Sequence, residues 1–255
     1  MAGRQRIDRV RRQYNQWVAN QTLEDYALRF TAKSARRWSA GRVANTALGA
    51  ISFLALEAIG GTITINYGAT NATAAILVVS VIIFACGLPI AYHAAKCGID
   101  IDLLTRGAGF GYIGSTITSL IYASFTFIFF AIEAVILATA LELCFGIPRP
   151  IGYLLSAVVI IPLVIYGITL ISRFQLWTQP LWIILHIIPF AAIAYADPRS
   201  FSDWTRFAGE RGSGSDQLDL LLFGTAASVV FSLVAQIGEQ VDFLRSEERR
   251  VGKEC

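Results

Sequence analysis

The apolar residues of this chain come in long blocks separated by short polar stretches. The blocks cover residues 43–67, 72–92, 112–141, 151–171, 176–195 and 218–237. A helix needs about 20 apolar residues to cross a bilayer, and a backbone in lipid must satisfy its own hydrogen bonds. The pattern therefore predicts an all-α integral membrane protein with six transmembrane helices. A transmembrane β-barrel is excluded, because its strands would alternate apolar and polar residues.

Composition supports the membrane class. Apolar residues make up 55% of the 255 residues and charged residues only 15%, whereas soluble domains carry about 25% charged residues. A soluble globular protein and a disordered chain are therefore both disfavoured.

The basic residues are unevenly distributed. Residues 1–42 hold ten Lys and Arg against three acids, which indicates a cytoplasmic tail rather than a nucleic-acid-binding arm, because membrane segments follow directly. With the N-terminus inside, the cytoplasmic segments hold thirteen basic residues and the outer segments four. The positive-inside rule thus predicts a multi-pass protein of the cell (plasma or inner) membrane with a cytoplasmic N-terminus.

The last residues differ from the rest of the chain. Residues 245–255 read RSEERRVGKEC, a string that one reading frame of a sequencing adapter would encode. We therefore expect this stretch to be a non-native tail and the membrane domain, 43–244, to be truncated. The alternative is a basic juxtamembrane tail.

Two acidic residues lie in the middle of apolar blocks, Glu57 in the first and Glu133 in the third. A charge at the bilayer centre costs about 2.5–3.5 kcal/mol, so each needs a cavity, a partner or protonation. They either line a substrate or ion path or form neutral hydrogen bonds between helices. Gly60 and Gly61 follow Glu57 and predict either a break in the helix, facing a site, or close helix packing.

The sixth block ends on polar residues within a hydrophobic helix. Gln236, Gly238, Glu239 and Gln240 predict a second break, or simply the helix end at the inner surface. In the third block, Phe129 and Glu133 are four residues apart and share a helical face. An aromatic ring beside a carboxyl group suits a flat, nitrogen-bearing ring as substrate.

Three stretches of the chain resemble the nucleobase–cation symporters, a family that includes cytosine permeases and hydantoin transporters. They are the lead into the first block (23–49), the sequence LLTRGAGFGYIGS (103–115), and the Asp-Phe pair at 242–243. In the second stretch Arg106 stands one residue further from Phe110-Gly111 than in the family pattern. In the third, Glu239-Gln240-Val241 replaces the family's Asn-Ile-Pro.

The resemblance implies the N-terminal part of a five-plus-five inverted-repeat transporter with broken helices one and six. It implies that Phe129 stacks on the substrate ring and that Glu133 stands where the family has a Gln that hydrogen-bonds the substrate. It also implies that backbone carbonyls near Leu56 and Ile59 bind sodium. The expected function is secondary transport of a small nitrogen heterocycle coupled to Na⁺ or H⁺, with no other cofactor. The oligomeric state stays open.

The two alternative functions are a sensory domain and an enzyme. A permease-like sensory domain of a signalling protein, such as a histidine kinase whose cytoplasmic part is missing, fits the same motifs. An enzyme is disfavoured, because the chain has only two His residues and shows no nucleophile–base or metal-ligand spacing.

Overall fold

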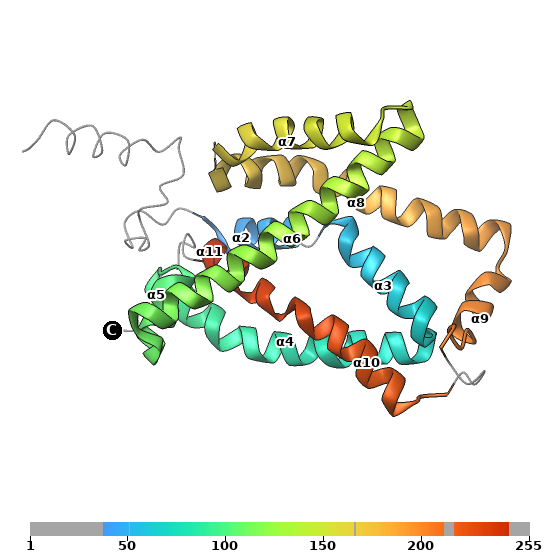
Figure 1. Cartoon of the computed structure of the whole chain (residues 1–255), viewed down its shortest axis with the longest axis horizontal. Helices are drawn as coiled ribbons and strands as arrows, with labels where there is room; N and C mark the ends of the chain where they lie inside the picture. The colour runs from blue at the N-terminus through green and yellow to red at the C-terminus, as the bar shows by residue number, and fades with distance from the viewer. Residues whose placement is uncertain (1–37, 51, 166, 212–216, 245–255) are drawn as a thin grey trace, which may run out of the picture.

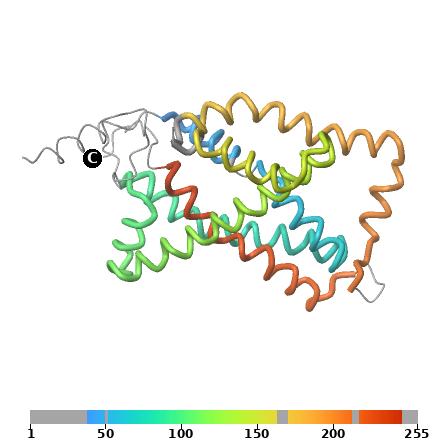
Figure 2. Tube along the Cα trace, turned by 45° about the horizontal axis from the view of Figure 1, so that its top comes forward, coloured from blue at the N-terminus to red at the C-terminus, as the bar shows by residue number. Residues whose placement is uncertain are grey.

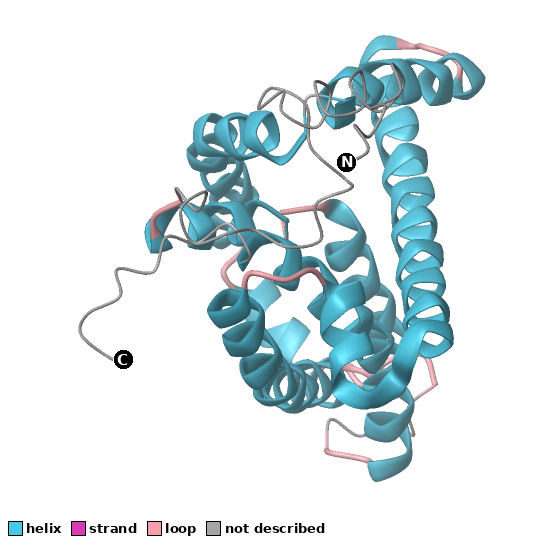
Figure 3. Cartoon of the chain, turned by 90° about the vertical axis from the view of Figure 1, so that its left-hand side faces the viewer, coloured by secondary structure: helices cyan, strands magenta, loops and turns pink. Residues whose placement is uncertain are grey.

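The computed structural model describes residues 38–50, 52–165, 167–211 and 217–244. Most of the predicted basic tail, 1–37, and the whole predicted non-native tail, 245–255, lie outside the described residues. Nearly all described residues are helical, and none of them lies in a strand (Figure 3). The predicted all-α class is confirmed.

The helices follow one another with short connections (Figure 1). They are α2 (Ala40–Ala50), α3 (Leu54–Tyr67), α4 (Ala69–Cys97), α5 (Ile101–Thr105), α6 (Gly111–Phe145), α7 (Arg149–Ile165), α8 (Gly167–Ala196), α9 (Arg199–Thr205), α10 (Leu220–Phe231) and α11 (Ile237–Leu244). A π-helical turn, η2 (Arg106–Phe110), precedes α6, and a 3₁₀ segment, η3 (Ser232–Gln236), joins α10 to α11.

Four helical stretches of the described chain are long and apolar enough to cross a membrane. They are Ala69–Cys97, Ile101–Phe145, Leu170–Ala196 and Leu220–Leu244, and the bent pair α2–α3 would make a fifth. The structure therefore has four or five helices that could cross a membrane, where the sequence predicted six. The predicted fourth span corresponds to α7, which has 17 residues, fewer than the about 20 that a crossing needs.

Large apolar side chains cover the outside of these helices. Phe127 is 72% exposed, Leu143 81% and Trp177 84%. A soluble protein rarely exposes such a continuous apolar surface, whereas lipid solvates it. The outer surface therefore agrees with a membrane environment.

The first span is broken, but not at the predicted place. Helix α3 runs without interruption through Gly60 and Gly61, and the chain bends by 54° between α2 and α3 instead. Phe53 has extended backbone angles (φ −137°, ψ 144°) just before α3 begins. Glycines weaken a helix by only about 1 kcal/mol each, and the N–H groups exposed at the bend find a partner described below, so the break lies before Glu57.

The sixth span is interrupted by a change of helix type rather than by a gap. Residues 232–236 form the 3₁₀ segment η3, and Gly238 lies inside the regular helix α11. The backbone stays helical across both junctions. The 3₁₀ segment overlaps the predicted break only at Gln236, and Gly238, Glu239 and Gln240 lie in the regular helix α11. A 3₁₀ stretch inside a longer helix often marks a hinge.

The core is built from small residues between α3, α4 and α10. Ala72 and Ala75 of α4 and Ala226 of α10 have no exposed surface and pack with Ile63 of α3. Small side chains let helix backbones approach closely, which is how helices associate in a membrane. In Figures 1 and 2 the C-terminal segment α10–α11, drawn in red, accordingly runs alongside α4.

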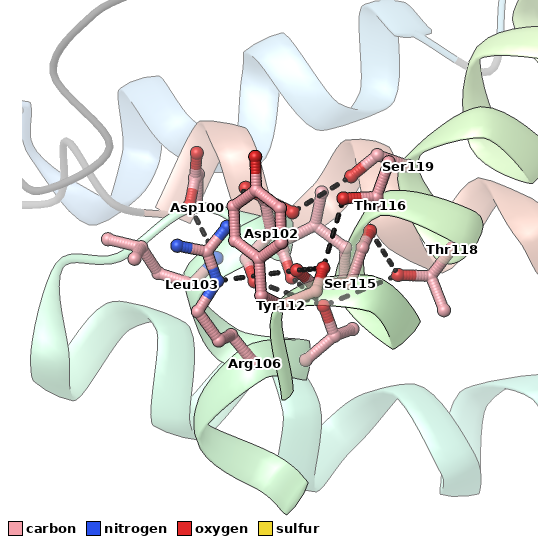
Figure 4. A network of polar contacts seen from close by, with 11 residues as sticks. Asp100, Asp102, Leu103, Arg106, Tyr112, Ser115, Thr116, Thr118 and Ser119 are labelled. Carbon is pink, nitrogen blue, oxygen red and sulfur yellow. Dashed lines mark hydrogen bonds and ion pairs between the residues drawn. The ribbon is translucent and has the colours of Figure 1, made fainter. Parts of the chain in front are cut away.

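The 103–115 stretch forms a polar corner between α5 and α6 (Figure 4). Arg106 pairs with Asp102 at 3.2 Å and donates through Nε to the Ser115 hydroxyl at 3.3 Å. The Ser119 hydroxyl donates to the other oxygen of Asp102 at 3.1 Å. Gly109 has φ 107°, which other residues rarely adopt. The resemblance motif therefore folds α5 back against the start of α6.

The fourth and fifth predicted segments meet at a different residue. Helix α8 already begins at Gly167, so Arg173 lies within a helix and not in a cytoplasmic loop. After α8, the connection to α10 contains α9 and then binds the α3–α4 turn: Glu210 N–H donates to Ile65 O, and Ala69 N–H donates to Phe207 O. Residues 212–216 lie outside the described chain.

Candidate functional site

A cavity of about 730 Å³ lies between α3, α4 and the interrupted sixth span. Five of the predicted site residues line it, namely Leu56, Ile59, Gly60, Gln236 and Gln240. Its other walls are mostly apolar, and Ser80 of α4 adds a hydroxyl. Sites for small organic ligands have this size and this character, an apolar surface with a few polar groups that fix orientation.

Helix geometry explains why these residues share the cavity. Leu56, Ile59, Gly60 and Ile63 follow the i, i+3, i+4, i+7 spacing of one face of α3. Gly60 has no side chain, and nothing lies within 4 Å of the position of a Cβ atom there. Gln236 and Gln240 are one turn apart across the η3–α11 junction. The face of α3 and the two amides thus meet across one space.

A second cluster lies at the break of the first span. The Glu133 carboxyl group of α6 accepts a hydrogen bond of 2.6 Å from the Ala55 N–H, in the first turn of α3. Phe129, one turn earlier on α6, contacts the ring of Phe53 edge-on, with centroids 5.6 Å apart, and packs on Phe125 at 4.5 Å. The predicted pair Phe129–Glu133 therefore binds the broken helix end itself.

This contact explains how an acidic residue is tolerated in the third span. The first N–H groups of a helix have no partner within the helix, and a carboxylate near them is also favoured by the helix dipole. Glu133 supplies that acceptor from a different helix. The sequence left open whether Glu133 lines a substrate or ion path or forms a hydrogen bond between helices. In this structure it forms a hydrogen bond between α6 and α3.

The second mid-span acid has a partner that sequence reasoning missed. Glu57 Oε1 contacts Nε2 of His186, from the middle of α8. The other ring nitrogen, Nδ1, lies 3.2 Å from the carbonyl oxygen of Trp182, whose ring packs on the imidazole at 3.9 Å between centroids. Glu57 is therefore paired, although 47% of its side chain is exposed.

Two further contacts join the first span to α8 in the same register. The Thr46 hydroxyl donates to the Ser172 hydroxyl at 2.9 Å, and the Gln179 amide donates to the Ser52 hydroxyl at 3.0 Å. We call the three contacts Thr46–Ser172, Ser52–Gln179 and Glu57–His186 the polar seam. From one contact to the next, the residue number increases in both the first span and α8, so the two run parallel.

A smaller cavity of about 330 Å³ lies along the polar seam. Its lining includes Ser52, Gln175, Thr178, Gln179 and Trp182. The Oε1 atom of Gln175 is buried and has no hydrogen-bond partner in the structure. A buried amide oxygen without a partner beside an open space is a position where water binds.

The spacing of α8 could have revealed this face. Residues 172, 175, 179, 182 and 186 recur every three or four positions and carry Ser, Gln, Gln, Trp and His. That is the period of one helical face. The sequence analysis divided this stretch between a loop at 172–175 and the apolar block 176–195, so it missed a polar stripe that runs through both.

The remaining predicted residues do not join either cluster. Gly61 is exposed, with nothing within 4 Å of a Cβ position. A Cβ on Gly238 would lie 3.0 Å from the Tyr122 ring, so this glycine serves close packing of α11 on α6. Glu239 follows it in α11 and does not line the large cavity.

The sodium site predicted at the carbonyl oxygens of Leu56 and Ile59 stays a prediction. Both residues lie inside the continuous helix α3, where carbonyls accept N–H groups four residues further on. Within the described ranges, no group of three or more His, Cys, Asp or Glu residues could hold a metal ion.

The helices, their apolar surface and the interrupted spans define a multi-pass helical membrane protein. Comparisons with family models, with curated proteins and with solved structures give no match to this chain. The more specific assignment therefore depends on the geometry of the site.

Proposed function

We propose that this protein is a secondary transporter that moves a nucleobase or a related nitrogen heterocycle across the cell membrane, coupled to Na⁺ or H⁺, with its N-terminus in the cytoplasm. The observation that carries the proposal is the 730 Å³ cavity between the first and sixth spans, both of which are interrupted. Transporters commonly bind their substrate beside such discontinuous helices.

The lining chemistry favours a flat heterocycle. The amides of Gln236 and Gln240 each offer donors and an acceptor, which matches the mixed donor–acceptor edge of a nitrogen ring. The apolar walls from α3 and α4 suit the faces of such a ring. A strongly charged substrate is disfavoured, because the lining includes no ionisable side chain.

The adjacent glycines of α3 provide a test with a matched control. Gly60 lines the cavity and Gly61 does not, and neither has an atom within 4 Å of a Cβ position. We expect Gly60→Trp to fill the cavity and abolish uptake of the ring compound. Gly61→Trp should transport normally, because its side chain points away from the cavity.

The measurement is uptake of radiolabelled cytosine, uracil, hypoxanthine and hydantoin into proteoliposomes that contain the full chain. Saturable uptake of at least one compound, lost in Gly60→Trp and kept in Gly61→Trp, supports the proposal. If the wild type takes up none of the four, or if both variants behave alike, the cavity is not a heterocycle site.

A further inference from the structure

We propose that Glu57 and His186 share one proton and together form the proton-binding site of the transporter, so that the coupling ion is H⁺. This inference depends on the proposed transport function for its physiological meaning. The shared proton itself follows from the contacts of the two side chains.

The neighbours of His186 favour one tautomer. A carbonyl oxygen can only accept, so in the tautomer that satisfies the 3.2 Å contact with Trp182 O, Nδ1 carries a hydrogen and donates it. Nε2 then faces the Glu57 carboxyl oxygen. A bare Nε2 and a carboxylate oxygen are both acceptors, and two acceptors repel each other, so a proton must lie between them.

Two protonation states satisfy this contact. In one, a neutral imidazole accepts from a protonated carboxyl group, and in the other, an imidazolium donates to a carboxylate. Each holds one proton between the two groups and has no net charge.

Neutrality matters because Glu57, in the first turn of α3, and His186, within α8, both lie in apolar helices. Releasing the shared proton leaves one net negative charge in the span, and adding a second leaves one positive charge, and hydrocarbon disfavours both. Proton affinity therefore changes when water reaches the pair from one side of the membrane. A carrier that alternates between two openings needs a site with this property.

A cavity that can hold water lies along the polar seam, next to the pair. The 330 Å³ cavity extends from Gln175 past Ser52 and Thr178 to Trp182, whose ring contacts His186. The partnerless Gln175 Oε1 and the two hydroxyl groups provide the two to four polar partners that an ordered water requires. Trp182 lies between this cavity and the imidazole.

Other ionisable groups on the neighbouring elements have different partners. Glu133 on α6 accepts from Ala55 N–H, and Arg42 on α2 donates to Ser172. Arg149 on α7 pairs with Glu142, and on α4 both His93 and Lys96 pack on the Tyr92 ring. Further ionisable groups on these helices and on α3, α8 and α9 include Tyr67, Tyr112, Tyr122, Tyr153, Arg173, Tyr195, Arg199 and Asp203. In the described part of the chain, no ion pair or hydrogen bond links another charged side chain to Glu57 or His186.

Nitrogen NMR can detect the shared proton without any substrate. The chain contains only two histidines, His93 and His186, so ¹⁵N-histidine labelling of the full chain in lipid gives two rings, and H93Q assigns them. We expect His186 to show a protonated Nδ1 and a strongly hydrogen-bonded Nε2 whose signal titrates differently from that of His93. In E57Q, the Nε2 signal should move to that of an unprotonated nitrogen.

Two results would overturn the shared proton. Either His186 titrates as His93 does in the wild type, or E57Q leaves the His186 signals unchanged. The wild-type titration alone decides the first point, so the test stands even if E57Q fails to fold.

Uptake measurements then separate this inference from the proposed function. With cytosine as the probe, an inward proton gradient should drive accumulation in the wild type and in H93Q, whereas E57Q and H186Q should lose the gradient-driven part and keep cytosine exchange. Accumulation that follows a sodium gradient alone, or gradient-driven accumulation in H186Q, would refute proton coupling at this pair. A shared proton in NMR with no uptake of any of the four ring compounds would instead refute the transport function.

Discussion

The two sides of α3 differ in what they face: one faces an open cavity and the other faces hydrogen-bonding partners on α8. One side faces the 730 Å³ cavity, where apolar walls and two glutamines leave space. The other side begins the polar seam, where Ser52 and Glu57 have partners on α8. An apolar cavity selects a ligand by shape and a few hydrogen bonds, whereas a polar pair in a span fixes each group to its partner. In the proposed transporter, cargo binds on one side of α3 and the coupling ion on the other.

The largest effect is expected in the core beside the cavity. Ala75 of α4 has no exposed surface and faces α10. Ala75→Leu should lower the free energy of unfolding in detergent micelles by about 3 kcal/mol, because extra methylene groups force the helices apart. Ala74→Leu, at a partly exposed position, is the control and should cost much less. Equal losses would mean that the α4–α10 contact does not determine stability.

The second largest loss of stability is expected when the Glu133 cap on the N-terminal end of α3 is removed. Glu133→Leu removes the acceptor of the Ala55 N–H and should reduce the unfolding free energy by about 2 kcal/mol. Glu133→Gln keeps an oxygen at that position and should lose less than half as much. Equilibrium unfolding of the two variants side by side measures the difference. No loss in Glu133→Leu would show that the bend is stable without its cap.

A single hydrogen bond of the polar seam should contribute less to the free energy of unfolding than the Glu133 cap does. Gln179→Leu removes the bond to Ser52, whose own hydroxyl still donates to the Leu48 carbonyl. Because Ser52 keeps a partner, we expect a loss of about 1 kcal/mol in the same unfolding experiment. Thr178→Val, next to it on the cavity wall, is the control. A loss as large as that of Glu133→Leu would mean that the polar seam acts as one cooperative network.

The smallest effect is expected at the exposed pair Arg149–Glu142, which lies on neither side of α3. Arg149 Nε donates to Glu142 at 2.5 Å, and this hydrogen bond raises the pKa of Arg149. Arginine is already protonated at every working pH, so the shift leaves its charge unchanged. Glu142→Gln should leave the thermal unfolding midpoint unchanged at moderate salt, because water screens exposed pairs. A clear drop would place this pair in a less polar environment than its exposure indicates.

The sequence predicted some elements correctly and others at the wrong residue. The apolar blocks predicted the helical class, since a spanning backbone has few other solutions. The first break lies between the end of α2 at Ala50 and the start of α3 at Leu54, and not at Gly60-Gly61. Local helix propensity indicates where a helix is weak, but it does not indicate where another helix supplies a cap. His186 was missed as a partner of Glu57 because the two are 129 residues apart in the chain.

The sequence by itself determined the class of protein and the residues that needed an explanation, since long apolar runs and mid-span acids have strong, local free-energy consequences. Five residues that the expected helix breaks or the family resemblance singled out line one cavity in the structure, namely Leu56, Ile59, Gly60, Gln236 and Gln240. Only the tertiary structure decided which faces meet: that Glu133 caps α3, that Glu57 contacts His186, and that Gly60 lines the cavity while Gly61 does not. Those contacts depend on how helices pack, which no single segment encodes.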